Sequence, residues 1–350
     1  MGKEGFIEAL VRPAVRVLTP YSSARDEYDG QGNEMIFLDA NENPFDNGVN
    51  RYPDPHQRAL KKQIARLRGV SPEQILLGNG SDEVLDLLFR VFCEPYTDTV
   101  ITLPPTYGMY SVLAGINAVE NIEIPLTSDF QPDVDLILEK AGANTKIIFL
   151  CSPNNPTGNS LEPARVQAIL KGFPGLVVID EAYIDFSEAE GFIPLLKTQP
   201  NLVVTQTLSK AFGLAGIRLG ICFAAPEIIA FLKRVKPPYN VNELTQQRAR
   251  TALSNPDKVA REIGELKASR ALLRKGLLNI PFVEEVFPTD ANFILARVDD
   301  ARLRYRQLVD KGIVVRDRST QLGCANTLRF TVGTPEENTA LLNTLKILDI

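Results

Sequence analysis

The sequence predicts an α/β protein with a large α/β/α domain around a mostly parallel sheet and a smaller α+β domain. Short apolar runs alternate with helical periodicity between about residues 74 and 224, a pattern typical of strands joined by crossover helices. Several runs are apolar throughout, as expected for strands that helices cover on both faces. At 350 residues the chain is also long enough for two domains.

Seven apolar runs are the predicted strands of the large sheet. They cover residues 75–77, 100–103, 122–124, 147–150, 176–179, 202–205 and 219–222. Between the first two runs, the segment 82–92 has the spacing of a helix with one apolar face, which carries Val84, Leu85, Leu88, Val91 and Phe92.

The last third of the chain has a different pattern. Helical periodicity from about residue 244 to 278 precedes predicted strands at 293–295, 313–315 and 328–332. A final helix should begin at Thr334, with Pro335 in its first turn and Glu337 closing a capping box. We expect residues 46–245 to form the large domain. Residues 1–45 and 246–350 should form the small domain with an N-terminal arm.

Composition argues against several classes of protein. A net charge of −5 disfavours a nucleic-acid binder, and no segment approaches the roughly 20 apolar residues of a membrane span. The N-terminus lacks the apolar core of a signal peptide. The four cysteines are far apart in sequence, with no spacing typical of a metal or redox site. We therefore expect a cytoplasmic protein without a metal site.

The single histidine, His56, limits the possible chemistry. It lies between Pro55 and Gln57 in a polar turn, where a structural or solvent-exposed histidine is the expected interpretation. Acid–base chemistry in this chain should therefore come from lysine, tyrosine or carboxylate side chains.

The predicted chemistry lies at the ends of strands, because ligands of open α/β sheets bind beyond the carboxyl ends of the strands. The first run is followed by Gly78–Glu83, which suits either a phosphate at a helix N-terminus or an ordinary turn capped by Ser81. The fourth run is followed by Cys151–Gly158, in which Asn155 is either a turn residue or a functional one.

Two other strand ends carry charged residues. Asp180 follows three apolar residues and needs a partner there, either a metal or a protonated pyridine nitrogen. Lys210 lies in the segment Thr207–Arg218, with two hydroxyl residues before it and an arginine eight residues after it. A lysine in such apolar sequence should have a lowered pKa, which suits a nucleophile that forms a Schiff base.

Together these motifs resemble the fold-type-I aminotransferases. The four segments that carry the resemblance are Gly78–Glu83, Asn154–Gly158, Asp180–Tyr183 and Thr207–Arg218. Further matching segments are 38–44, 51–55, 104–110, 236–242 and 328–334, so the resemblance extends from about residue 20 to 335. It implies that fold and pyridoxal 5'-phosphate as the cofactor.

The resemblance also implies a role for each site residue. Lys210 would hold the cofactor as a Schiff base and transfer a proton, while Asp180 would keep the pyridine nitrogen protonated. Tyr183 and Asn155 would bond the phenolic oxygen of the ring. The remaining contacts, ring stacking and phosphate binding, would come from Tyr107, Thr207, Ser209, Arg218, Ser81 and Asp82.

Five residues relate to the substrate and to a second subunit. Tyr52 matches a tyrosine that reaches the cofactor phosphate of the neighbouring subunit, which implies a homodimer with shared active sites. Arg329 matches the arginine that binds the anionic end of the substrate. Tyr21 and Arg316 match positions near the substrate phosphate, with Asn155 close by, although Tyr21 is also compatible with ordinary packing in an N-terminal arm.

The sequence departs from the family pattern at two places. Gln206 stands where an arginine is common, and Ile221-Cys222 replaces an aromatic residue. Neither position belongs to the expected catalytic set. The departures therefore bear on the subgroup to which the chain belongs and not on its activity.

Within the family, the motifs most resemble enzymes that transfer an amino group between L-histidinol phosphate and 2-oxoglutarate in histidine biosynthesis. An aminotransferase for aromatic amino acids and a threonine-phosphate decarboxylase of the same fold remain open, because the motifs do not show which bond at the α-carbon is broken. A non-catalytic regulator module is a remote alternative, since the chain has no helix-turn-helix signal or basic excess. A Rossmann dehydrogenase is disfavoured because no Gly-x-Gly-x-x-Gly follows a strand.

Overall fold

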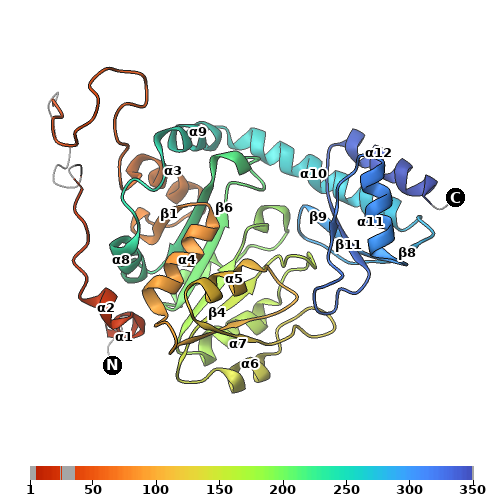
Figure 1. The fold of residues 1–350 in the computed structure, drawn as a ribbon, viewed down its shortest axis with the longest axis horizontal. Helices are drawn as coiled ribbons and strands as arrows, with labels where there is room; N and C mark the ends of the chain where they lie inside the picture. The colour runs from red at the N-terminus through yellow and green to blue at the C-terminus, as the bar shows by residue number, and fades with distance from the viewer. Residues whose placement is uncertain (1–4, 24, 26–35, 349–350) are drawn as a thin grey trace.

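The computed structural model describes residues 5–23, 25 and 36–348 of the chain. The expected N-terminal arm and small domain therefore extend in part over residues that lie outside the described ones. Figure 1 shows a large sheet flanked by helices, a second small sheet at the right, and the long helix α10 (Pro256–Leu277) between them. Among the described residues, no helix has the length and apolar character that a membrane crossing requires.

The large sheet contains all seven predicted strands, in the order β1-β7-β6-β5-β4-β2-β3. Only β7 runs antiparallel to its neighbours, so the prediction of a mostly parallel sheet is confirmed. The strands are β1 (Ile75–Asn79), β2 (Thr99–Thr102), β3 (Glu120–Glu123), β4 (Thr145–Cys151), β5 (Leu176–Asp180), β6 (Leu202–Thr207) and β7 (Leu219–Ala224).

Helices cover both faces of this sheet, which explains why its strands are apolar throughout. In β5, Leu176 and Val178 pack into one core, whereas Val177 and Ile179 pack into the core on the opposite face. The first core includes α4 (Ser81–Phe92), α5 (Met109–Ile116) and α8 (Pro226–Val235). The second includes α3 (Arg58–Arg68), α6 (Val134–Lys140), α7 (Pro163–Gly172) and α9 (Glu243–Leu253).

The N-terminal helices pack against the large domain. Helices α1 (Phe6–Leu10) and α2 (Pro13–Arg16) place Ile7, Val11 and Val15 in the core beside α4 and α8. The backbone N–H of Arg12 also donates to the carbonyl of Val91, at 3.0 Å. Grouping residues 1–45 with the small domain therefore does not describe these two helices, because their apolar side chains are buried beside α4 and α8, which cover one face of the large sheet.

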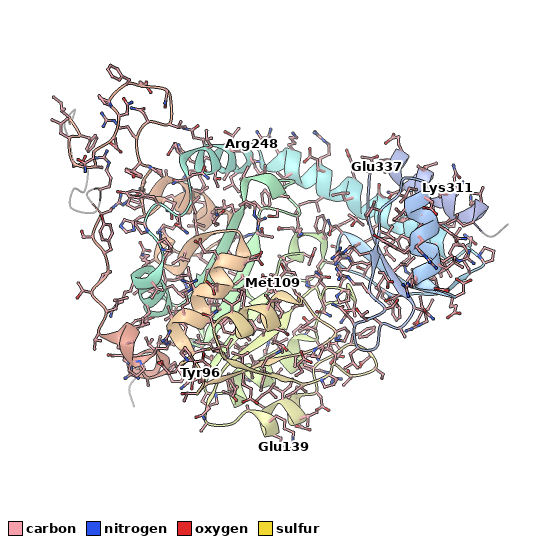
Figure 2. All side chains as sticks on the ribbon, viewed as in Figure 1. Tyr96, Met109, Glu139, Arg248, Lys311 and Glu337 are labelled. Carbon is pink, nitrogen blue, oxygen red and sulfur yellow. The ribbon has the colours of Figure 1, made fainter. Side chains whose placement is uncertain are left out.

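The small domain contains a four-stranded sheet in the order β10-β11-β9-β8. Its strands are β8 (Val283–Val286), β9 (Phe293–Val298), β10 (Arg316–Asp317) and β11 (Thr327–Thr331), and its other helices are α11 (Ala301–Asp310) and α12 (Pro335–Ile347). Four 3-10 turns complete the described elements: Pro72–Gln74, Ile184–Phe186, Ile193–Lys197 and Ala215–Ile217. Figure 2 shows charged side chains such as Glu139 and Lys311 on the outside of the two domains.

Three details of the C-terminal third differ from the sequence prediction. The expected helix 244–278 is divided into α9 and α10, because Pro256 begins a new helix whose N-cap, Asn255, accepts from the backbone N–H of Lys258. The expected strand at 313–315 is replaced by the short β10, and β8 was not predicted. The capping box of α12 is confirmed: Thr334 and Glu337 bond each other's backbone N–H groups. Since Ala249 of α9 lies in a large-domain core, we propose a domain boundary near Ser254.

Candidate active site

A cavity of about 130 Å³ lies at the carboxyl ends of the parallel strands β4, β5 and β6. Strand ends that are distant in sequence meet there because parallel strands end at the same edge of the sheet. Ten of the expected cofactor residues line this cavity: Ser81, Asp82, Tyr107, Asn155, Asp180, Tyr183, Thr207, Ser209, Lys210 and Arg218. The structure thus brings together all but one of the residues expected to contact the cofactor.

Asp180 is a buried acid at the end of β5, only 4% exposed. Burial raises the pKa of its carboxyl group, although hydrogen bonds from the Tyr110 hydroxyl (2.8 Å) and the Ala182 N–H (3.1 Å) favour the ionised form. Among the described residues, no basic side chain forms an ion pair with Asp180. A protonated ring nitrogen would supply the missing positive charge, so this site fits the pyridine of the expected cofactor.

Tyr110 is a site residue that the sequence analysis missed. It is fully buried, stacks on Phe149 with ring centroids 5.0 Å apart, and directs its hydroxyl at Asp180. The motif Pro104–Tyr110 contained the signal, because Tyr110 closes the same segment as Tyr107. Its contact with Asp180 depends on how α5 packs on the sheet, which a motif does not show.

Lys210 extends into the cavity near the two residues expected at the ring oxygen. Its ammonium group lies 5.6 Å from the centre of the Tyr183 ring. Partial burial and the positive charge of Arg329 lower the pKa of Lys210, which increases the fraction of the nucleophilic neutral amine. Asn155 donates to the Tyr183 hydroxyl at 3.4 Å, so the two groups share one side of the cavity.

The N-terminus of α4 and the guanidinium of Arg218 form a cradle for an anion. α4 begins after Gly80 without a side-chain cap, so the alternative that Ser81 is an ordinary N-cap is wrong. A Cβ atom on Gly80 would lie 2.6 Å from Nη2 of Arg218, and one on Gly220 would lie 2.3 Å from the backbone N of Ser81. Two glycines therefore allow this cation and the helix N-terminus to approach each other, an arrangement that fits a phosphate.

Hydroxyl groups and an aromatic ring complete the cavity. The hydroxyls of Thr207 and Ser209 lie 2.9 Å apart next to this cradle. On the α4 side, the Tyr107 hydroxyl donates to Asp82 at 3.1 Å, and burial raises the pKa of this tyrosine. These contacts hold the tyrosine ring at the cavity wall, where stacking on a planar cofactor ring is possible.

The two arginines expected to bind substrate lie opposite each other in the small sheet. Arg316 of β10 and Arg329 of β11 are paired residues of an antiparallel ladder. Arg329 also donates from Nη1 to the side-chain oxygen of Asn155, which connects the small sheet to the cavity. Its guanidinium group lies 5.0 Å from the centre of the Phe293 ring. An anionic group bound by this arginine would therefore lie near Asn155 and Lys210.

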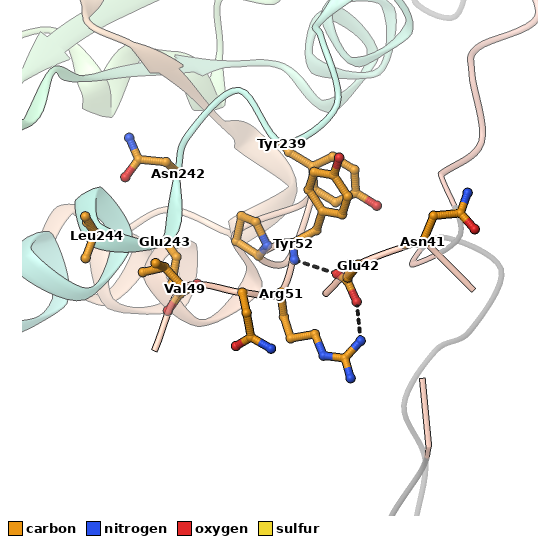
Figure 3. Close-up of a pocket in the computed structure, with 12 residues that line it drawn as sticks. Asn41, Glu42, Val49, Arg51, Tyr52, Tyr239, Asn242, Glu243 and Leu244 are labelled. Carbon is orange, nitrogen blue, oxygen red and sulfur yellow. Dashed lines mark hydrogen bonds and ion pairs between the residues drawn. The ribbon is translucent and has the colours of Figure 1, made fainter. Parts of the chain in front are cut away.

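Tyr52 and Tyr21 lie outside this cavity within the single chain. Tyr52 is 51% exposed, stacks on Tyr239 with ring centroids 4.5 Å apart, and lines a separate surface pocket of about 450 Å³ (Figure 3). Figure 3 also shows Glu42 accepting hydrogen bonds from the Tyr52 backbone and from Arg51. Tyr21 is 74% exposed and lines another pocket, together with His56.

Gln206 is part of a buried pair behind the cavity. Its side-chain amide donates to the Glu181 carboxyl group at 2.8 Å, and the Phe192 N–H donates to the same group at 2.5 Å. Burial raises the pKa of Glu181 to about 7, an increase that these hydrogen bonds only partly offset. A neutral glutamine thus stands where an arginine would compensate the charge of the acid.

The sheet topology and the cavity define an α/β enzyme whose site fits a phosphorylated cationic ring, with the guanidinium of Arg329 bonded to Asn155 at its edge. The chain belongs to the aminotransferase class I and II family, whose model matches residues 27–345.

Individual relatives agree with this assignment. A histidinol-phosphate aminotransferase of Flavobacterium johnsoniae is 62% identical over 98% of this chain and 99% of its own length. The crystal structure of the histidinol-phosphate aminotransferase from Clostridium acetobutylicum is 25% identical, with a TM-score of 0.80 over 86% of this chain and 91% of the other. That of Sinorhizobium meliloti, solved with pyridoxal-5'-phosphate, is 24% identical, with a TM-score of 0.78 over 85% and 82%.

Proposed function

We propose that this enzyme transfers the amino group of L-histidinol phosphate to 2-oxoglutarate, using pyridoxal phosphate, in histidine biosynthesis. The observation that supports it most strongly is the 62% identity to a histidinol-phosphate aminotransferase over nearly the whole chain. The geometry is consistent with this assignment. A lysine with a lowered pKa lies in the cavity near the buried Asp180 and near Arg329, a cation that suits anionic substrates.

Several residues in and beside the cavity would have a physical task in this reaction. When bound, pyridoxal phosphate supplies an aldehyde that takes up the amino group and a protonated ring that withdraws electrons. Asp180 would hold the proton on the ring nitrogen, and Tyr110, which donates to Asp180, would orient its carboxylate. Lys210 would hold the cofactor and move a proton at the α-carbon of the substrate. Tyr183 and Asn155, which bond each other, would donate to the ring oxygen.

The phosphate and the substrate are held by two separate groups of residues. Arg218, Thr207, Ser209 and the N-terminus of α4, which line the cavity, would hold the cofactor phosphate. Arg329 and Arg316 of the small sheet would bind the anionic end of the substrate. Because different residues hold the cofactor and the substrate, the cofactor would stay bound while the amino donor leaves and the amino acceptor binds.

The proposed active form is a homodimer with shared active sites. Tyr52 is exposed, and exposed apolar side chains lie near it in the same segment of the chain: Ile36, Leu38, Phe45 and Val49. A second copy would cover this surface, and Tyr52 would then reach the cofactor phosphate of its partner. Tyr21 would approach the substrate through the same assembly.

Mixing two variants that each lose one residue of the proposed shared site tests this arrangement. Tyr52→Phe and Lys210→Ala subunits, mixed and reassociated, should be more active together than the sum of the two measured separately, because one of the two sites in a mixed dimer has both residues intact. Activity equal to the sum of the separate variants, or a monomer in analytical ultracentrifugation, would contradict the shared site.

A cytoplasmic location is also proposed. All four cysteines of the chain are buried and unpaired, which suits a reducing compartment. Measuring the enzyme in cell fractions with a tagged chain tests this location.

Comparing three donors tests the substrate assignment. Amino-group exchange with 2-oxoglutarate and release of carbon dioxide should be measured with L-histidinol phosphate, L-phenylalanine and L-threonine phosphate. We expect the highest kcat/KM for exchange with L-histidinol phosphate and no carbon dioxide from any donor. Preference for phenylalanine would make the enzyme an aromatic aminotransferase, and carbon dioxide from threonine phosphate would make it a decarboxylase.

A further inference from the structure

Arg318 is a third arginine on the face of the small sheet that carries Arg316 and Arg329. The backbone N–H of Arg318 donates to the carbonyl of Thr327 at 2.9 Å, which extends the pairing of β10 with β11. Side chains two residues apart along a strand point to the same face, so Arg318 lies on the face of Arg316. Arg329 is directly opposite Arg316 and shares this face.

This face of the sheet is turned toward the catalytic cavity. The alternate residues of β11, Leu328 and Phe330, are buried in the core of the small domain and therefore point the other way. On the arginine face, Arg329 donates to Asn155 at the cavity. The positive charges of Arg329 and Arg318 also act on the Tyr183 hydroxyl and favour its ionised form. Arg318 is thus close enough to influence the groups around Lys210.

The three arginines form an unfavourable arrangement in the absence of an anion. Like charges on paired strands repel each other. Burial and the positive charge of Arg318 lower the pKa of Arg329. In the part of the chain that the structure describes, Nε of Arg318 and Nε of Arg329 are buried without hydrogen-bond partners. Buried donors of this kind are costly to leave unsatisfied, which indicates that a bound anion completes the cluster.

We propose that Arg318 is a specificity-determining residue that binds the phosphate of a phosphate-monoester amino donor together with Arg316 and Arg329. This inference rests on the proposed function. A phosphate monoester carries close to two negative charges and three terminal oxygens, whereas a carboxylate carries one charge and two oxygens. A carboxylate is satisfied by one bidentate arginine, while a phosphate can accept from all three. Arg318 therefore favours phosphorylated donors over glutamate.

The substitution Arg318→Gln separates the two classes of donor. We expect kcat/KM for L-histidinol phosphate to fall about 10- to 100-fold, as for the loss of a hydrogen bond between charged groups. The value for L-glutamate should fall by a much smaller factor. Arg318→Lys should retain part of the phosphate preference, because it keeps the charge but not the planar fork. Arg306→Gln, on the exposed side of α11, is the matched control.

A binding measurement makes the test independent of turnover. Methyl phosphate is an unreactive monoester, and its affinity for the cofactor-loaded enzyme can be measured by isothermal titration calorimetry, with acetate as the carboxylate probe. Arg318→Gln should weaken methyl phosphate about tenfold or more and acetate by a smaller factor. If both probes, or both donors, change by the same factor or not at all, the role of Arg318 is overturned.

The proposed function and the role of Arg318 can be contradicted separately. If the unmodified enzyme does not use L-histidinol phosphate, the proposed function fails, and selective loss of methyl phosphate binding still supports Arg318 as a phosphate ligand. If Arg318→Gln lowers the melting temperature strongly, the Arg318→Lys variant is measured instead. A folded lysine variant that distinguishes methyl phosphate from acetate as well as the unmodified enzyme does would overturn the requirement for a guanidinium group at this position.

Discussion

The large sheet presents a negative charge to the cavity, whereas the small sheet presents positive charges. The large sheet ends in Asp180, a buried acid whose carboxyl pKa is raised by burial. The small sheet presents Arg316, Arg318 and Arg329, cations that share one face. The first arrangement suits a cationic ring that stays bound, and the second suits an anion that exchanges. The difference indicates that cofactor and substrate are bound by separate structural units, which mutations should be able to separate.

Asp180→Asn should have the largest effect, because it removes the charge that keeps the ring nitrogen protonated. We expect kcat to fall by about two to three orders of magnitude for every amino donor, as for the loss of a preorganised electrostatic group. Steady-state kinetics with glutamate and L-histidinol phosphate measure this loss. A decrease confined to one donor would mean that Asp180 acts on the substrate and not on the cofactor.

Arg329→Ala should act mainly on substrate binding. The loss of a charge-assisted pair should raise KM for 2-oxoglutarate about 10- to 100-fold. Arg302→Ala on α11, which is exposed, is a control for removal of an arginine. An unaltered KM would show that the anion is bound elsewhere.

Tyr110→Phe tests the group that orients the Asp180 carboxylate. The hydroxyl of Tyr110 donates to Asp180 at 2.8 Å and lowers the pKa of that carboxyl group, so its removal should raise this pKa further. We expect kcat to fall about tenfold and the acid limb of the pH profile to move to higher pH. Tyr96→Phe is the matched control, because Tyr96 is 93% exposed (Figure 2). A lower kcat without a shift of the acid limb would indicate a packing effect only.

Glu181→Gln should have the smallest effect on activity, because Glu181 is a buried acid outside the cavity lining. Its folded-state pKa of about 7 lies above its ordinary value of 4.5, so the folded protein holds the proton more tightly than the unfolded chain. Glu181 therefore makes the free energy of unfolding fall as pH rises from about 4.5 to 7, by roughly 3 kcal/mol at most.

Denaturant unfolding at pH 5 and pH 8 measures this contribution. The decrease between these pH values should be smaller in Glu181→Gln than in the unmodified protein. Equal decreases would show that the Glu181 carboxyl group titrates normally in the folded state. The result would also indicate whether Gln206 leaves a buried charge uncompensated.

The residues that line the cavity could be predicted from the sequence, whereas Tyr110, Arg318 and the packing of the N-terminal helices could not, and the reason is physical. Parallel strands end at one edge of a sheet, so Asp180 and Lys210 could be placed together from the positions of their strands alone. Tyr110 and Arg318 depend on how a helix packs and on the register of a two-residue strand, and neither is visible in a motif. The N-terminal helices were misplaced because Ile7, Val11 and Val15 do not indicate which apolar surface they cover.

Lys210 is the lysine proposed to carry the cofactor, and identification of the modified lysine tests this assignment. The purified enzyme is reduced with borohydride, digested, and analysed by peptide mass spectrometry for the lysine that carries the cofactor. We predict the label on Lys210, whose amine lies in the cavity with Asp180 and Tyr183. A label on Lys61, a buried lysine whose pKa is lowered to about 8 mainly by burial, or on any other lysine would contradict the account.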